Sequence, residues 1–108
     1  MPDLKNILAE IGDGSITTAK NELLNFYNQA KSEQIDFAQE TADKVKKWLE
    51  MRVKGEINNE EFLALLDARK RVVLQNLNTL EIHSRARVEK ILFGIIDTIT
   101  NKILDKII

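Results

Sequence analysis

Apolar residues recur along most of this chain at intervals of three and four positions, the spacing that places side chains on one face of an α-helix. The first group is short and consists of Leu4, Ile7, Leu8 and Ile11. Two much longer groups follow, separated by a polar stretch that contains Gly55. The pattern predicts an all-α fold with one short helix and two long ones.

The short helix is expected to span about residues 3–11. Asp3 is a suitable N-cap, and Gly12-Asp13-Gly14 favours a turn that ends the helix. A helix this short is not stable alone in water, because helix nucleation is costly. We expect it to fold back onto the most apolar part of the chain, which includes Ile99, Ile103, Leu104, Ile107 and Ile108.

The first long helix is expected to span about residues 15–54, since neither glycine nor proline occurs between Ser15 and Lys54. Ser15 or Asp13 would cap its start. A polar patch, Ser32-Glu33-Gln34, is the place where this helix would bend or break. The apolar face consists of Ile16, Ala19, Leu23, Phe26, Tyr27, Ala30, Ala38, Ala42, Val45 and Leu49.

A turn at residues 55–58 separates the two long helices. Gly55 suits the left-handed position just after a helix end. Asn58 and Glu61 have the spacing of a capping box, and Ile57 and Phe62 have that of a hydrophobic staple. The sequence therefore predicts a helical hairpin that bends here.

The second long helix is expected to span about residues 59–107. Asn78 and Glu81 match a second capping box, so this helix would break near Asn78 if it breaks at all. Apolar residues on both sides of Asn78 stay on one face, which favours a continuous helix. Folding at the turn also brings charges of opposite sign together. Acidic residues of the first long helix come opposite basic residues of the second, namely Glu33, Asp36, Glu40 and Asp43 opposite Arg69, Lys70 and Arg71.

Two helices that meet along one line leave part of their apolar surface exposed, and soluble monomers rarely expose a large continuous apolar patch. We therefore expect two chains to associate as an antiparallel four-helix bundle with coiled-coil packing. The predicted dimer interface consists of Leu66, Val73, Leu77, Leu80, Val88, Ile91, Ile95 and Ile99. The alternative is a monomer folded back into four shorter helices, broken near Glu33 and Asn78.

Composition narrows the possible partners. The 108 residues correspond to a single domain, 1–108, and the net charge of -1 gives no general attraction for nucleic acid. Cysteine is absent, and the N-terminus lacks the basic and apolar segments of a secretory signal. These features favour a cytoplasmic protein that binds itself and a further protein, with a membrane surface as the weaker alternative.

Candidate catalytic chemistry is sparse. His83 is the only histidine, and the Glu-x-x-His spacing of helical di-iron sites does not occur around it. The sequence also contains no glycine-rich phosphate loop. We therefore expect no catalytic residues, no cofactor and no metal site, and we do not expect an enzyme. The basic residues Arg69, Lys70, Arg71, Arg85 and Arg87 form no single stripe on a helix, which disfavours nucleic-acid binding.

The expected function is that of a protein-interaction or scaffolding module that self-associates. The alternative is a peripheral lipid-binding or secreted helical-hairpin protein that uses the apolar C-terminal helix. In architecture, the hairpin is similar to the small secreted Trp-X-Gly helical hairpins, which form four-helix dimers. Trp48 is followed by Leu49 and Glu50, however, so the Trp-X-Gly motif itself is absent.

Overall fold

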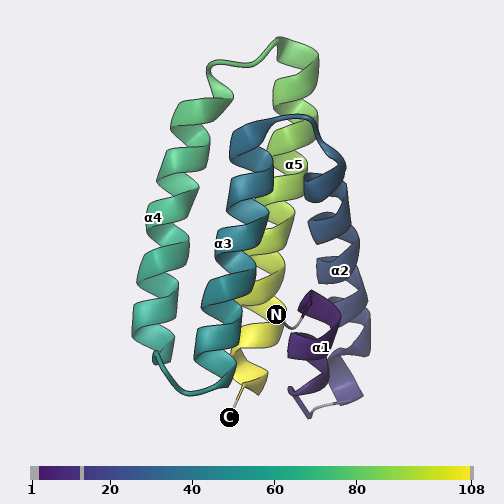
Figure 1. The fold of residues 1–108 in the computed structure, drawn as a ribbon, viewed down its shortest axis with the longest axis vertical. Coiled ribbons are helices and arrows are strands. Elements are labelled where there is room, and N and C mark those ends of the chain that lie inside the picture. Colours follow the sequence, from purple (N-terminus) through teal and green to yellow (C-terminus); the bar gives the residue numbers. More distant parts are fainter. Residues whose placement is uncertain (1–2, 13, 108) are drawn as a thin grey trace.

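The computed structural model describes residues 3–12 and 14–107, and these residues are all-helical with no strand. The α-helices, labelled in Figure 1, are α1 (Leu4–Ala9), α2 (Thr17–Ser32), α3 (Asp36–Val53), α4 (Asn59–Leu77) and α5 (Ile82–Thr98). A 3₁₀ turn, η1 (Gly14–Ile16), precedes α2. The chain ends in a π-helical turn, η2 (Ile99–Ile103), and a second 3₁₀ turn, η3 (Leu104–Lys106).

The four longer helices run side by side, each antiparallel to the next along the chain (Figure 1). Contacts join α2 to α3, α3 to α4, α4 to α5, and α5 back to α2, so the four helices enclose a common core. The short helix α1 packs outside them, against α2 and α3. The prediction of an all-α fold is therefore confirmed.

The two long helices expected at 15–54 and 59–107 are each broken. The first stops at Ser32 and resumes at Asp36, and the second stops at Leu77 and resumes at Ile82. The longest dimension of the structure is 40 Å, whereas a straight helix of about 38 residues would extend ~57 Å. Folding back lets each chain bury its own apolar faces, which two straight helices would leave partly exposed.

The break near Asn78 is capped differently from the prediction. Asn78 is the C-cap of α4, and Glu81 is the N-cap of α5 without a side-chain hydrogen bond, so the expected capping box is not formed. Arg85 instead caps backbone carbonyls at the end of α4 and in the connection. Its Nε donates to the Leu77 carbonyl at 3.1 Å and its Nη2 to the Leu80 carbonyl at 3.2 Å.

The turn between α3 and α4 has the predicted structure. Gly55 adopts φ 79°, and the N–H of Glu56 donates to the Met51 carbonyl at 2.8 Å, which is the hydrogen bond of a left-handed helix end. The Asn58 side chain accepts from the Glu61 N–H at 2.8 Å, and the Glu61 side chain accepts from the Asn58 N–H at 3.0 Å. Phe62 is fully buried behind this capping box.

Helix α1 also follows its prediction in part. Asp3 accepts from the Asn6 N–H at 2.9 Å, and the Lys20 ammonium donates to the Ile11 carbonyl at 2.6 Å. The α1 face packs mainly on α2 and α3 rather than on the C-terminal turns. Its apolar residues Leu4, Ile7, Leu8 and Ile11 are all buried. The start of α2 differs from expectation, since Ile16 is the N-cap and not Ser15, and Asp13 lies outside the described residues.

The apolar residues of the C-terminal part are spaced four apart, at Ile91, Ile95, Ile99, Ile103 and Ile107. In an α-helix of 3.6 residues per turn, such residues drift steadily around the axis. The wider π-helical turn at Ile99–Ile103 compensates for this drift, and all five side chains remain buried. The single helix expected up to residue 107 therefore ends as an α-helix at Thr98.

At Gly94, α5 packs directly against the Phe26 ring of α2. A Cβ added at this position would lie 2.7 Å from Cζ of Phe26 and 2.8 Å from both of its Cε atoms. We expect Gly94→Ala to lower the free energy of unfolding by roughly 1–2 kcal/mol in urea denaturation, because overpacking outweighs the gain in helix propensity. Gly12→Ala is the control, since nothing lies within 4 Å of its added Cβ. A Gly94→Ala variant at least as stable as the wild type would contradict this contact.

Candidate functional site

The residues predicted to form a dimer interface lie mainly inside the closed chain. Seven of them are buried within the single chain, namely Leu66, Val73, Leu77, Val88, Ile91, Ile95 and Ile99, and Leu80 is partly buried. The breaks near Glu33 and Asn78 explain this difference, because they bring α2 and α3 of the same chain over those side chains. In this conformation, seven of the eight residues belong to the core of the chain, and Leu80 packs against that core.

A different set of apolar side chains is exposed. Among the described residues, the exposed large hydrophobic side chains are Leu63, Val72, Leu74 and Ile82, at 39%, 37%, 48% and 76% of their full accessible area. All four belong to α4 or to the first residue of α5. These side chains lie outside the stripe that begins with Phe62 and Leu66, so a search for apolar residues off the main stripe would have found those on α4.

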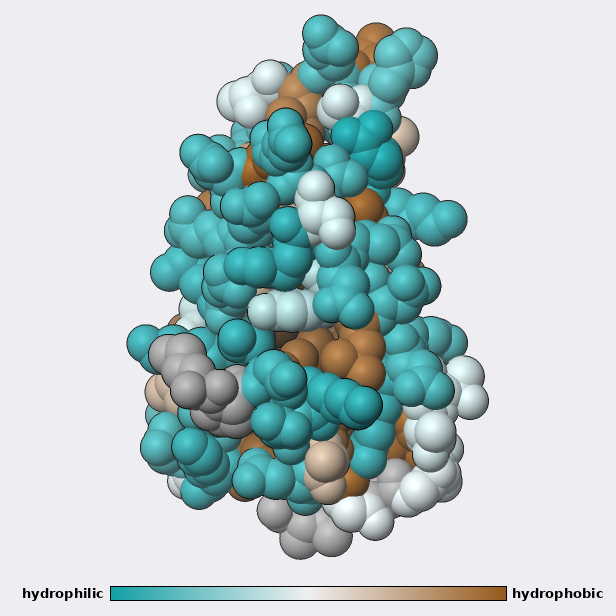
Figure 2. Space-filling view, turned by 45° about the vertical axis from the view of Figure 1, so that its right-hand side comes forward, coloured by the Kyte–Doolittle hydropathy of each residue, from teal (hydrophilic) through white to brown (hydrophobic). Residues whose placement is uncertain are grey.

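The face of the molecule shown in Figure 2 is mostly hydrophilic, with hydrophobic residues visible in small areas between charged and polar ones. The exposed apolar residues on α4 and α5 are therefore candidates for a binding surface.

Leu63 and Leu74 share the flank of α4 that faces α5. Lys70, which has the same orientation on the helix, lies 3.6 Å from the carboxylate of Asp97 and places its ammonium 5.1 Å from the centre of the Phe93 ring. Asp97 and Phe93 both belong to α5. The apolar side chains on this flank are thus accompanied by a charged pair, as is common at the rim of a protein interface.

A buried arginine joins α3 to α4. Arg69 is only 7% exposed, and its Nε donates to the Thr41 hydroxyl at 2.9 Å and its Nη2 to the Phe37 carbonyl at 3.4 Å. Its Nη1 also lies 3.5 Å from the Glu40 carboxylate. Glu40 and Arg69 thus form one ion pair between the acidic and basic groups that were expected to face each other. The sequence did not indicate the contact with buried Thr41, although Arg69 occupies a position within the apolar stripe of α4.

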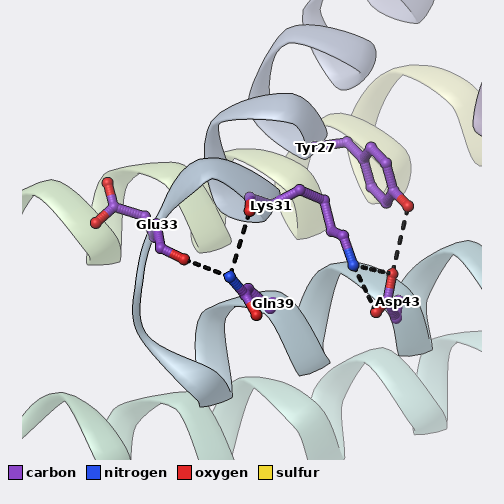
Figure 3. A network of polar contacts seen from close by, with 5 residues as sticks. All are labelled: Tyr27, Lys31, Glu33, Gln39 and Asp43. Atoms are coloured by element: carbon purple, nitrogen blue, oxygen red, sulfur yellow. Dashed lines mark hydrogen bonds and ion pairs between the residues drawn. The ribbon is translucent and has the colours of Figure 1, made fainter.

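The connection between α2 and α3 is held by side chains (Figure 3). The Gln39 amide donates to the Glu33 carbonyl at 2.6 Å and to the Lys31 carbonyl at 3.4 Å. The Lys31 ammonium donates to Asp43 at 2.8 Å, and the Tyr27 hydroxyl donates to the same carboxylate at 3.3 Å. The hydrogen bond to Asp43 raises the pKa of Lys31 above its ordinary value. These contacts fix the angle between α2 and α3.

A further ion pair ties this connection to α5. Arg87 donates to both carboxylate oxygens of Glu33, each at 3.0 Å, and this hydrogen bonding raises the pKa of the arginine. Arg71 is paired with Asp67 at 2.7 Å. The basic residues on α4 and α5 therefore make separate contacts within the chain and do not form one surface that could bind nucleic acid. They are Arg69, Lys70, Arg71, Arg85 and Arg87.

The described part of the chain contains no candidate metal site. His83 is exposed near the start of α5. Among residues 3–12 and 14–107, no group of three or more His, Cys, Asp or Glu side chains is arranged to hold a metal ion. Within the same residues, no helix has the length and apolar character needed to cross a membrane.

Comparisons with known proteins add no functional information. No protein-family model matches the chain, no curated protein sequence is significantly similar to it, and no solved structure matches its fold.

Proposed function

We propose that this protein is a non-enzymatic helical interaction module that self-associates and serves as a scaffold for another protein. The observation that supports this proposal is the exposure of Leu63, Val72, Leu74 and Ile82 on α4 and at the start of α5. Leu63 and Leu74 lie on the same side of α4, whereas Val72 lies on nearly the opposite side of that helix. Exposed large apolar side chains are common in protein-binding surfaces, and we call Leu63, Leu74 and Ile82 the α4–α5 apolar surface.

Leu74 and Ile82 are the strongest candidate anchors on this surface. They flank the connection between α4 and α5, which lies at the upper end of the structure in Figure 1, away from α1 and the C-terminus. Ile82 is 76% exposed, so a partner that covers it removes most of an isoleucine side chain from water, and this burial stabilises the complex. A partner with an amphipathic helix would suit these anchors, because apolar residues one and two turns apart on a helix can reach both.

Self-association is the second part of the proposal, and we propose a homodimer with four-helix packing. Most of the residues expected at its interface lie inside the closed chain, so they are available only if the chain opens. A dimer of closed chains would have to use the α4–α5 apolar surface instead.

Lipid binding through the C-terminal helix has less support. The apolar residues that would enter a membrane surface are buried in the chain, including Ile91, Leu92, Ile95, Ile96, Ile99, Ile103 and Leu104. They could contact lipid only after α5 had left its place against α2 and α4. The α4–α5 apolar surface needs no such rearrangement.

The test compares the wild type with the double variant Leu74→Ser and Ile82→Ser as baits in the native host lysate. We expect at least one protein to be retained only by the wild type. That protein, once purified, should bind the double variant at least tenfold more weakly, which corresponds to about 1.4 kcal/mol or more. Melting temperatures should be similar, because both side chains are exposed.

Ala68→Ser is the matched control, since Ala68 is an exposed residue on the same helix and outside the α4–α5 apolar surface. A purified partner that binds all three proteins equally would contradict the proposed surface. Light scattering tests self-association separately. A mass near 12.4 kDa after refolding at high protein concentration would rule out the dimer.

A further inference from the structure

The three connections between the longer helices are of two kinds. The α3–α4 connection contains Gly55 at φ 79° and the Asn58 capping box, and a straight helix could not pass through it without losing both. Residues 33–35 and 78–81 contain neither glycine nor proline. Among the described residues, only Gly55 has a positive φ. Nothing in the backbone therefore prevents residues 33–35 and 78–81 from becoming helical.

The two glycine-free connections lie at the same end of the structure, opposite the Gly55 turn (Figure 1). They also lie at matching distances from that turn, because α3 has 18 residues and α4 has 19. Beyond them, α2 has 16 residues and α5 has 17. If both connections straightened, the chain would consist of two long antiparallel helices of nearly equal length.

The structure already contains two helix pairs that such a change would preserve. Helices α3 and α4 pack against each other across the Gly55 turn, and α2 packs against α5. Straightening would separate the α2/α5 pair from the α3/α4 pair without disrupting the packing within either pair. A second chain opened in the same way could then supply the missing pair.

The apolar stripes continue across both connections. Val88 follows Leu77, and Thr41 follows Ala30, each after eleven residues, which is about three turns of an α-helix. These four residues are all buried. In a straight helix, the residues that now face the core would therefore still share one side, and the core could be rebuilt between two chains with the same side chains.

Specific contacts favour the bent form. In a straight helix, the carbonyls of Lys31 and Glu33 would accept from backbone N–H groups four residues later. In the bent form, the Gln39 amide donates to both carbonyls instead. At the other connection, the Arg85 guanidinium donates to the carbonyls of Leu77 and Leu80. These two side chains compensate for the helical hydrogen bonds that the breaks remove.

We propose that the chain forms an exchanged dimer, in which residues 33–35 and 78–81 become helical and the α2/α5 pair of each chain packs on the α3/α4 pair of the other. This proposal rests on the self-association part of the proposed function and names its mechanism. The exchange uses core side chains, so Leu63 and Leu74 stay outside and remain free for another partner. Conversion requires the core to open, so it is slow, and the dimer fraction depends on the protein concentration during folding.

The first experiment uses the contact between Lys31 on α2 and Asp43 on α3, which lies within one chain in the monomer and between chains in the exchanged dimer. The protein has no cysteine, so single cysteines can be introduced without interference. A Lys31→Cys chain and an Asp43→Cys chain are unfolded together, refolded at high concentration and treated with a short bis-maleimide. We expect a cross-linked product of twice the chain mass in the dimer fraction. Lys31→Cys mixed with Ala68→Cys should give none.

The second experiment changes the connection itself. Gln34→Pro cannot occupy a straight helix, whereas Glu33 already has the extended backbone, ψ 138°, that a residue before proline prefers. We expect Gln34→Pro to keep the monomer fold and to lower the dimer fraction at least tenfold. Gln39→Leu removes the amide that supports the bent form, and we expect it to raise the dimer fraction several-fold.

The outcomes of these experiments distinguish the exchange of helix pairs from the broader proposal that the chain self-associates. A dimer that forms equally in Gln34→Pro and gives no cross-link between positions 31 and 43 would overturn the exchange while leaving self-association in place. A wild-type chain that refolds only to monomer at every concentration would overturn both the exchange and the proposed self-association. Binding of another protein to the α4–α5 apolar surface is measured independently of either result.

Discussion

Removal of residues 1–12 is expected to destabilise the protein strongly. This segment buries four aliphatic side chains, three on α1 and Ile11 just after it, and α1 covers part of α2 and α3. Truncating a single buried leucine or isoleucine typically costs about 2–5 kcal/mol, so removing all four should cost at least as much. For a chain of this size, that corresponds to a fall in melting temperature of roughly 10 °C or more, measured by circular dichroism.

The Lys5→Ala variant is the control for this deletion, because Lys5 belongs to α1 and is exposed. Leu8→Ala provides an intermediate case, since Leu8 is 2% exposed and α1 itself is retained. If the truncated chain melts at the same temperature as the wild type and stays as soluble, α1 is dispensable to the fold and this interpretation is wrong.

The loss of stability on replacing Arg69 should depend more on the volume of the new side chain than on its charge. We expect Arg69→Ala to lower the free energy of unfolding by about 2–4 kcal/mol, because it leaves a cavity where the side-chain stem packs. Arg69→Met fills much of that space. Thr41 keeps its own hydrogen bond to the Phe37 carbonyl at 2.7 Å, so no buried hydroxyl is left without a partner. We therefore expect the methionine variant to be within about 1 kcal/mol of the wild type in urea denaturation.

Two controls separate the contributions to the Arg69 effect. Glu40→Gln removes the charge of the partner carboxylate, whose side chain is 57% exposed, and should change stability by less than about 0.5 kcal/mol. Arg71→Ala removes a neighbouring arginine whose side chain is 74% exposed and should also have a small effect. If Arg69→Met proves as unstable as Arg69→Ala, the hydrogen bonds of the guanidinium and not its packing stabilise the α3–α4 contact.

The candidate surface was less predictable than the fold. Periodicity identified the apolar stripe of α4 and α5 correctly, but it could not say whether a second chain or the same chain would cover it. The exposed residues Leu74 and Ile82 were not singled out, since each lies outside that stripe. Ile82 is the first residue of α5, so its position depends on the break after Leu77, whereas Leu74 lies on the outer side of α4 together with Leu63.

Local signals in the sequence determined the helical class, the turn at Gly55 and the start of α1. Each depends on residues close together in the chain, such as Asn58 with Glu61 or Asp3 with the Asn6 N–H. The breaks at 33–35 and 78–81 were decided only by tertiary structure. Both segments are compatible with a helix, so the balance depends on distant contacts, including Arg87 with Glu33 and the burial of α5 against α2. Local propensity differs too little between the bent and straight forms to choose between them.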